Sequence, residues 1–282
     1  MRNSTENIYR QKINQVIDYI SANLHTPLSI GTLAAQINVS ERQLLRIMRS
    51  ALDEPLAAYV ARQRIERAVL YMQTEEMNLA NLAVSVGYDN PQSFSKAFKK
   101  QFGIPPKTYK DKLRERLKEQ IQNSKNTYNE IQPEICKEAA LDLIYIRILG
   151  QYGDKRLYET AWNKLIGFLK NRQILSASTR FIGISFDDPN VTVPGLCRFY
   201  ACASIPKPET PTGEFGTIRL REGKYAVYTL KGSYSGLQDL YNCINLNFSD
   251  KLCFGLAYEE YLTNPRNATG EELLTKIHIP IK

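Results

Sequence analysis

Histidine is scarce in this 282-residue chain, and the residues that bind metals or form disulfides do not cluster. There are two histidines, His25 and His278, and five cysteines without CxxC spacing. A zinc site is therefore not expected. The cysteines are interpreted as reduced, partly buried thiols, with redox sensing as the alternative. They are Cys136, Cys197, Cys202, Cys243 and Cys253.

Long hydrophobic runs are absent as well. No stretch approaches the length that spans a membrane, and the first twelve residues, MRNSTENIYRQK, are polar. A secretory signal would need an apolar segment at this position. We therefore expect no signal peptide, no membrane contact and a cytoplasmic protein.

Motifs of the common enzyme classes are missing. The chain has no P-loop and no HExxH sequence. In the segment GSYSG, residues 232–236, Tyr234 occupies the place of a nucleophile-elbow serine. Asp187 and Asp188 precede Pro189, which is typical of a turn rather than of an acid-base pair. The sequence predicts no enzyme, no catalytic residue, no metal and no cofactor.

Acidic residues are outnumbered by basic ones. The chain carries 37 Lys and Arg against 29 Asp and Glu, a formal net charge of +8. The excess is larger in the first 110 residues than in the remainder, which fits a polyanionic partner. The length suffices for two domains, each with its own core.

Residues 79–109, LANLAVSVGYDNPQSFSKAFKKQFGIPPKTY, have the pattern of a helix-turn-helix. Apolar residues recur at helical spacing before Gly87, which permits a tight turn, and Asp89 or Asn90 offers an N-cap to a second helix. One face of that helix is predicted to pack through Phe94, Ala97, Phe98 and Gln101. The opposite face, with Gln92, Lys96 and Lys99, is predicted to enter a DNA groove.

The same pattern occurs about fifty positions earlier, so the chain contains an internal repeat. There the packing positions are Leu44, Ile47, Met48 and Ala51, and the opposite face carries Arg42, Arg46 and Arg49. Pro55 and Tyr59 correspond to Pro105 and Tyr109. Residues 57–72 contain neither glycine nor proline and are predicted to form one connecting helix. A further helix is expected over about residues 8–24.

The segment GYDNPQSFSKAFKKQFGIPPKTY resembles the signature of AraC/XylS transcriptional regulators. The resemblance implies that both second helices enter successive major grooves on one face of the duplex. Matched residue by residue, the base-facing positions are Arg42, Leu45, Arg46, Pro91, Gln92 and Lys96. Leu45 can contact only a thymine methyl group, and Pro91 has no donor. Arg49 and Lys99 lie at the flank, where they are phosphate partners or only solvated charges.

The expected domain order follows from changes in composition along the chain. Residues 1–115 form the all-α DNA-binding domain with two helix-turn-helix motifs. Residues 116–130 are charged and helix-prone, pass into NSKNTYNE, and are interpreted as a linker. From residue 131 to 282, β-branched and aromatic runs alternate with helical patches, which favours an α+β domain.

The second half also contains a duplication. A Gly-x-Tyr triplet at 150–152 and at 232–234 precedes a helical segment, and each helix is followed by a strand, a polar loop and a further strand. The first strand of each pair ends near a proline, in Asp188-Pro189 and in Asn264-Pro265. The pattern predicts two β-α-β-β units.

This arrangement resembles the gyrase-inhibitor-like effector-binding domain, and the ending YEEYLTNP to TKIHIPIK is similar to that family's last two strands. The resemblance implies an aromatic pocket with a central acidic residue. Matching the family's pattern to residues 258–261 places that acid at Glu259. On a strand, Glu259 and Tyr261 share one face, while Tyr258 and Glu260 share the other.

A carboxylate among aromatic rings would attract a cationic, apolar ligand through charge pairing and cation–π contact. Trp162, Tyr152 and Tyr234 are candidate pocket walls beside Glu259 and Tyr261. The alternative is that Glu259 lines a solvated sheet face and that the tyrosines belong to an ordinary core.

The sequence thus predicts a DNA-binding transcriptional regulator whose C-terminal domain senses a small molecule. Expected partners are double-stranded DNA, bound by a monomer, and a small, amphipathic cationic effector; RNA polymerase is a candidate partner. Two alternatives stay open for the C-terminal domain, namely a small-molecule hydrolase and a module that sequesters compounds or contacts another protein.

Overall fold

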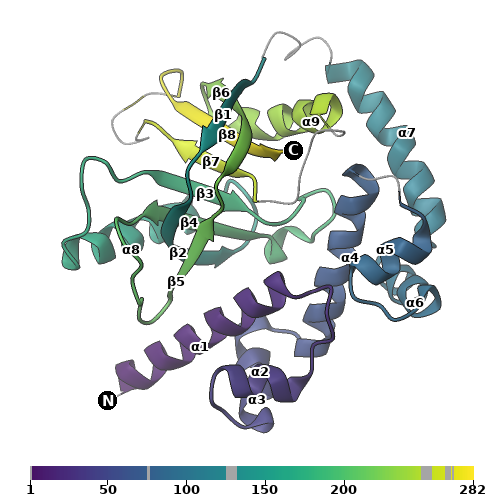
Figure 1. Cartoon of the computed structure of the whole chain (residues 1–282), viewed down its shortest axis with the longest axis horizontal. Coiled ribbons are helices and arrows are strands. Elements are labelled where there is room, and N and C mark those ends of the chain that lie inside the picture. Colours follow the sequence, from purple (N-terminus) through teal and green to yellow (C-terminus); the bar gives the residue numbers. More distant parts are fainter. Residues whose placement is uncertain (1, 75–76, 125–131, 249–255, 264–267, 269) are drawn as a thin grey trace. The chain divides into compact units, whose positions relative to one another are not determined.

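The computed structural model describes residues 2–74, 77–124, 132–248, 256–263, 268 and 270–282. The chain divides into two compact units, residues 1–116 with 212–214 and residues 117–211 with 215–282 (Figure 1). The first unit is helical and the second is built on a β-sheet. The expected combination of an all-α domain and an α+β domain is therefore confirmed.

Seven helices precede the sheet in the described part of the chain. They are α1 (Arg2–Ala22), α2 (Ile30–Gln36), α3 (Glu41–Leu52), α4 (Leu56–Thr74), α5 (Leu79–Ser85), α6 (Pro91–Phe102) and α7 (Pro106–Ser124). Helix α1 begins earlier than expected, because the polar N-terminal residues continue the helix. Helix α7 continues to Ser124, so the linker expected from residue 116 begins as helix. The connecting helix over residues 57–72 is confirmed as α4.

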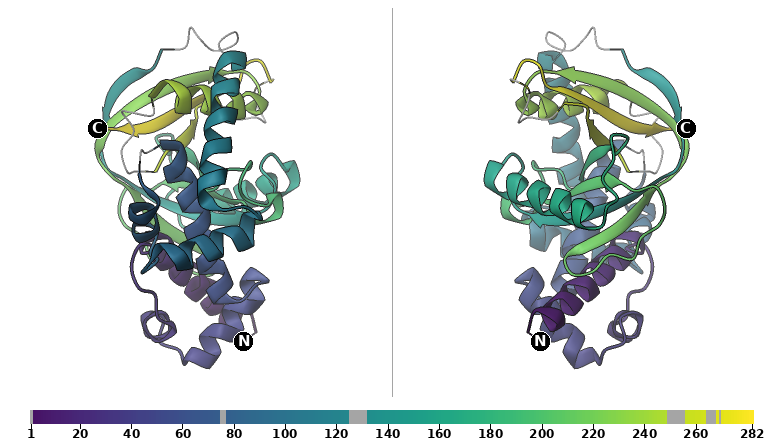
Figure 2. Two further views of the ribbon diagram at one scale, coloured as in Figure 1. Left: turned by 90° about the vertical axis from the view of Figure 1, so that its right-hand side faces the viewer. Right: turned by 90° about the vertical axis from the view of Figure 1, so that its left-hand side faces the viewer.

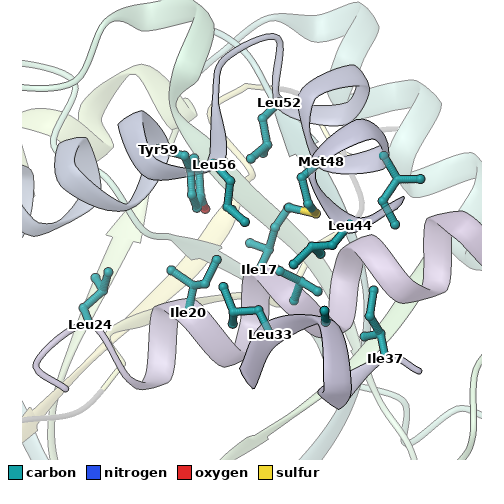
Figure 3. Close-up of a cluster of buried hydrophobic side chains, with 13 residues drawn as sticks. Ile17, Ile20, Leu24, Leu33, Ile37, Leu44, Met48, Leu52, Leu56 and Tyr59 are labelled. Carbon is teal, nitrogen blue, oxygen red and sulfur yellow. The ribbon is translucent and has the colours of Figure 1, made fainter. Parts of the chain in front are cut away.

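The first helix-turn-helix is held by a core to which the first four helices contribute. Figure 3 shows this cluster, with Ile17 and Ile20 from α1, Leu33 from α2, Leu44 from α3 and Tyr59 from α4. Leu44 and Ile20 are completely buried. Because α1 supplies one wall of this core, the first recognition motif depends on a helix outside the motif itself.

The second helix-turn-helix has an aromatic core instead. Phe94 and Phe98 of α6 are completely buried, and Phe98 packs edge-on against Tyr109 at a centroid distance of 5.3 Å. Gln101 was expected on this packing face but is exposed. Phe102 takes its place, at 4.9 Å from Phe98, because α6 ends there and the chain turns back through Tyr109.

The second unit contains one antiparallel sheet of eight described strands, in the order β1-β6-β8-β7-β3-β4-β2-β5. The strands are bent and twisted rather than flat (Figures 1 and 2). They are β1 (Glu134–Glu138), β2 (Leu141–Leu149), β3 (Phe181–Ser185), β4 (Arg198–Ser204), β5 (Phe215–Leu220), β6 (Gly223–Lys231), β7 (Tyr258–Tyr261) and β8 (Leu274–Ile281).

The two predicted repeats are β2-α8-β3-β4 and β6-α9-β7-β8, with α8 (Lys155–Asn171) and α9 (Leu237–Phe248). Two strands were not predicted. Strand β1 leads into β2 but pairs with β6, and β5 leads into β6 but pairs with β2. The strand that precedes each repeat in sequence therefore pairs with a strand of the other repeat. The expected turn at Asn264-Pro265 lies outside the described residues.

The repeats meet at the centre of the sheet, where β3 pairs with β7 and Gly183 lies opposite Glu259. Helices α8 and α9 pack on the same face of the sheet. Leu165 of α8 packs against β2 and β4, and Leu240 of α9 packs against β6 and β8. The other face carries a separate core that includes Tyr145, Tyr200 and Tyr258. A side chain at the centre of β3 or β7 thus faces either the helices or this second core.

Candidate functional site

Both recognition helices begin with a capped first turn. The Ser40 hydroxyl accepts a hydrogen bond from Gln43 N at 3.2 Å, and the Asn90 side chain accepts one from Ser93 N at 2.8 Å. Each cap satisfies a backbone donor that the helix leaves unpaired, which is worth about 1 kcal/mol. The predicted cap at Asn90 is confirmed, and Pro91 occupies the first turn, where its fixed φ suits a helix start.

The turns before these helices each contain one residue in the left-handed conformation. Gly87 has a φ of 89°, and Asn38 takes the corresponding position in the first motif with a φ of 51°. Glycine and asparagine adopt this left-handed conformation most readily. The backbone amides of Val39 and Tyr88 then close the turns, donating to Ala34 O at 3.1 Å and to Ala83 O at 2.9 Å.

The outer faces of α3 and α6 carry the residues predicted to contact DNA. Seven of them are exposed and Pro91 is partly buried; the exposed ones are Arg42, Leu45, Arg46, Arg49, Gln92, Lys96 and Lys99. Within the described residues, no ion pair engages the five cations of this set. Their charges are therefore available to an external anion, since no carboxylate of the protein neutralises them.

The second candidate site lies at the centre of the sheet, on its helix-covered face. Glu259 is 4% exposed, and its carboxylate accepts hydrogen bonds from Tyr261 Oη at 2.5 Å and from Tyr241 Oη at 3.3 Å. The interpretation of Glu259 as part of a solvated sheet face is therefore wrong. No lysine, arginine or histidine among the described residues pairs with it.

The surroundings of Glu259 disfavour ionisation of its carboxyl group. Burial raises the pKa of Glu259, and hydrogen bonds from Tyr261, Tyr241 and Ser185 offset only part of that rise. Burial and the nearby carboxylate in turn raise the pKa values of Tyr241 and Tyr261. Both phenols consequently stay protonated and act as donors.

The neighbouring carboxylate shows the opposite arrangement. Glu260 points to the other face, where Arg180 Nε and Nη2 donate to its two oxygens at 2.7 Å each, and His278 Nε2 lies at 3.2 Å. Burial opposes ionisation of Glu260, but His278 and the Arg180 guanidinium beside the carboxylate lower its pKa to about 2. Of the two adjacent acids, Glu260 is paired with Arg180, whereas Glu259 has only hydroxyl donors.

Two of the predicted pocket residues, Trp162 and Tyr234, pack against Tyr261. Trp162 packs edge-on against it at a centroid distance of 5.7 Å, and Tyr234 does so at 5.5 Å. Tyr152 lies further out, with its hydroxyl donating to Arg198 O at 2.9 Å and accepting from Asp187 N at 3.1 Å. The structure brings Glu259, Tyr261, Trp162 and Tyr234 together, and Tyr152 packs against the same hydrophobic cluster as Trp162 and Tyr261.

Two tyrosines of this cluster were not predicted as site residues. Tyr241 of α9 donates a hydrogen bond to Glu259. Tyr158 of α8 interacts with the Glu259 charge, which together with burial raises its pKa. Tyr158 lies four positions before Trp162 and therefore on the same helix face, a spacing that could have indicated it. We call Glu259, Tyr158, Trp162, Tyr234, Tyr241 and Tyr261 the tyrosine cluster.

A glycine makes room for the central contact. Gly183 faces the same side of the sheet as Glu259, and a Cβ atom placed on it would overlap the Tyr261 hydroxyl and approach Phe199 Cζ to 2.7 Å. The Tyr261 ring can reach back to Glu259 because no side chain stands at this position.

The expectations about metals, thiols and membranes can also be compared with the structure. No group of three or more metal-ligating side chains occurs among the described residues. Four cysteines are free thiols, three of them buried and Cys136 partly buried, whereas Cys253 lies outside the described residues. In the part of the chain that the structure describes, no helix has the length and apolar character to cross a bilayer.

Comparison with known proteins assigns both units to families. Residues 131–282 match the GyrI-like small molecule binding domain, and residues 33–112 match a helix-turn-helix domain. The chain belongs to the AraC-type regulators that carry a GyrI-like domain. The GyrI-like match covers the sheet, both of its helices and every member of the tyrosine cluster.

Relatives of this AraC-type regulator are transcriptional regulators rather than enzymes. A putative HTH-type transcriptional regulator, YkgA of Escherichia coli, is 35% identical over 108 residues, which cover 38% of this chain and 45% of YkgA. The HTH-type transcriptional activator AarP of Providencia stuartii is 32% identical, over 35% of this chain and 73% of AarP. The chain thus spans less than half the length of YkgA.

Solved structures similar to part of this AraC-type regulator include a C-terminal domain. The crystal structure of the EcmrR C-terminal domain is 14% identical, with a TM-score of 0.44, and covers 54% of this chain and 98% of that domain.

Proposed function

We propose that this regulator binds an amphipathic cation at the tyrosine cluster and changes its DNA-directed activity in response. The observation that supports the proposal is the contrast between Glu259 and Glu260. Glu260 is paired with Arg180 within the protein, whereas Glu259 is buried with hydroxyl donors and no cationic partner among the described residues. An unpaired buried carboxylate is unfavourable, so a ligand cation would supply the charge that the protein does not.

The aromatic members fit the rest of such a ligand. Tyr158, Trp162, Tyr234, Tyr241 and Tyr261 are all only partly buried, although Glu259 between them is almost inaccessible. We propose that a cation with hydrocarbon substituents stacks on these rings. A cation–π contact contributes about 0.5 to 2 kcal/mol, depending on its desolvation.

The test compares a cation with a neutral molecule of the same shape. A suitable pair is 3-hydroxyphenyltrimethylammonium and 3-tert-butylphenol, titrated into the full chain by calorimetry. In Glu259→Gln we expect affinity for the cation to fall about 10-fold to 100-fold, because a charge-assisted contact is worth roughly 1.5 to 3 kcal/mol. Affinity for the neutral isostere should change little. Equal losses for both ligands would exclude Glu259 as the source of charge preference.

Binding alone does not establish regulation. A reporter driven by a promoter that the protein occupies should respond to the cation with wild-type protein and fail to respond with Glu259→Gln. Binding without any effect on transcription would favour a sequestering module instead, and turnover of the ligand would favour a hydrolase. Direct contact with RNA polymerase is a further part of the proposal, and crosslinking on the promoter would detect it.

We also infer that one chain occupies the DNA as a monomer in the cytoplasm. Two recognition helices on one polypeptide can reach two major-groove segments about one helical turn apart without a second subunit. The DNA site then need not be palindromic. Footprinting on sites selected from random DNA, together with the mass of the complex in solution, tests this inference. A strict requirement for a symmetric site and a dimer would contradict it.

A further inference from the structure

A single side chain joins the two helix-turn-helix motifs. Arg64 lies in the middle of α4, the helix that connects the motifs (Figure 1). Its Nε donates to Leu24 O at 3.0 Å and its Nη2 donates to Thr26 O at 2.8 Å. Both acceptors follow the end of α1, where free carbonyl groups and the helix dipole favour a cation.

The same guanidinium also contacts the second motif. Its Cζ lies 5.7 Å from the centroid of the Tyr88 ring, and its charge interacts with Asp89. Tyr88 packs edge-on against Phe94 of α6 at 5.6 Å. The contacts therefore run without a break from the end of α1, through Arg64 and Tyr88, to the second recognition helix.

The segment that follows α1 packs into the core of the first motif. The Leu24 side chain is 1% exposed and forms one end of the core cluster in Figure 3, while its carbonyl is the acceptor for Arg64. Any shift of α1 against Arg64 would therefore disturb the core under α3. Both recognition helices are thus tied, through their own cores, to one guanidinium.

The backbone at Gly87 packs closely against the end of α1 and against Arg64. A Cβ atom on Gly87 would overlap Leu24 O and approach Arg64 Cζ and Nε to 2.9 Å. The turn of the second motif therefore lies directly against the end of α1, with no space for a side chain. Interfaces packed this closely hold one arrangement rather than a range of them.

We propose that Arg64 is a positioning residue that fixes the separation of the two recognition helices and thereby the spacing of the two DNA segments that the protein reads. Arg64 lies on the connecting helix and acts through Leu24 and Tyr88, so its contribution is to geometry and not to base contacts. The two segments are read as one site because α3 and α6 are held at one distance.

The test measures how DNA affinity changes with the spacing between the two DNA segments. The probes are a duplex selected from random DNA by the wild-type protein, its derivatives with one base pair inserted or removed between the two footprinted segments, and a duplex that retains only one segment. We expect the wild type to lose about tenfold in affinity when the spacing changes, the size of a typical mismatch penalty. For Arg64→Ala, this loss should shrink to about threefold or less, while affinity for the single segment stays within about twofold.

Companion variants separate positioning from folding. Tyr88→Leu removes the ring and should reproduce the effect of Arg64→Ala, and the double variant should be no worse than either one. Tyr88→Phe keeps the ring and should behave as wild type, since the buried Tyr88 hydroxyl has no hydrogen-bond partner among the described residues. Arg67→Ala is the comparison variant, because Arg67 of α4 also holds α1, with its Nη2 donating to Ser21 O at 3.1 Å. It should leave spacing discrimination unchanged.

Two outcomes would overturn the proposal. One is a loss of affinity in Arg64→Ala that is equal at every spacing, which would indicate a general structural role. The other is unchanged spacing discrimination in a variant that circular dichroism shows to be folded. If Arg64→Ala does not fold, Arg64→Lys serves instead, because it keeps the charge but cannot reach both carbonyl oxygens in the same geometry. A relaxed spacing preference is then expected, and full wild-type discrimination would reject the proposal.

Discussion

The hydroxyl of Tyr261 reaches back along β7 to donate a hydrogen bond to Glu259 at 2.5 Å. The two residues are two positions apart and therefore stand on the same face of the strand. Tyr261 can lean over its neighbour because Gly183, opposite Glu259 on β3, has no side chain there. The same ring is packed edge-on by Trp162 and Tyr234. One tyrosine thus links the aromatic members of the site to the acid.

The first prediction concerns the charge state of Glu259. Tyr261→Phe keeps the ring but removes a donor that favours the ionised carboxylate, so the pKa of Glu259 should rise further. A permanent cation binds the ionised form, and its affinity therefore falls as the pH drops through that pKa. In the variant this fall should occur at higher pH. Calorimetry with 3-hydroxyphenyltrimethylammonium across a pH series measures the displacement.

Tyr225→Phe is the control for that experiment. The Tyr225 hydroxyl donates to Arg221 O at 3.0 Å, and its ring belongs to the core on the opposite face of the sheet. This substitution also removes one phenol hydrogen bond, but it should leave the pH dependence of ligand binding unchanged. An equal displacement in both variants would mean that Tyr261 does not act through Glu259.

The second prediction compares two glycine substitutions. Gly183→Ala should displace Tyr261 or Phe199, cost about 1 to 3 kcal/mol of stability and weaken cation binding. Gly167→Ala in α8 adds the same methyl group where no atom lies within 4 Å, and should be neutral or stabilise by up to about 1 kcal/mol. Urea unfolding followed by the fluorescence of Trp162, the single tryptophan, reports on this domain. Similar behaviour of the two variants would contradict the role given to Gly183.

The third prediction concerns Glu260, whose pKa is lowered to about 2. An acid with a depressed folded pKa stabilises the protein above its unfolded pKa, and that stabilisation is lost as the pH falls towards the folded value. Its size is on the order of 3 kcal/mol. Glu260→Gln should therefore be strongly destabilising at pH 7 and less so at pH 3, by Trp162 fluorescence in urea. Glu222→Gln, at an exposed position, should show no such pH dependence.

The helices of the first unit were predictable because their packing faces and caps are determined by residues close together in the sequence. Apolar residues three and four positions apart define the packing faces of α3 and α6, and Asn90 caps its own helix. The error at Gln101 arose at a helix end, where the path of the chain after Gly103 decides which side chain is covered. Periodicity carries no information about that path.

The environment of Glu259 was predictable only in part. Strand alternation correctly separated Glu259 from Glu260, but it could not show which face the helices cover. Tyr241 and Tyr158 come from α9 and α8, and their approach to Glu259 depends on the pairing of β3 with β7. Strands β1 and β5 were missed for a related reason, because each pairs with a strand of the other repeat.

The fourth prediction concerns specific DNA contacts. Arg46 and Lys96 are exposed near the middle of α3 and α6 and are proposed to face base edges. Replacing either with alanine should cost about 1 to 3 kcal/mol on a selected DNA site and much less on random DNA, because base contacts discriminate and phosphate contacts do not. Competition binding at one fixed salt concentration measures both losses. Equal losses on the two kinds of DNA would remove these residues from the reading face.

The last prediction concerns Arg49 and Lys99, which occupy corresponding positions at the flank of the two recognition helices and are exposed without an ion pair among the described residues. If each contacts a phosphate, it displaces a counterion on binding, so each alanine variant should lower the slope of log affinity against log salt by about one. The loss should be similar for selected and random DNA. Lys155→Ala, an exposed lysine in the sheet domain, should leave the slope unchanged. A wild-type slope in Arg49→Ala or Lys99→Ala would show that the charge is only solvated.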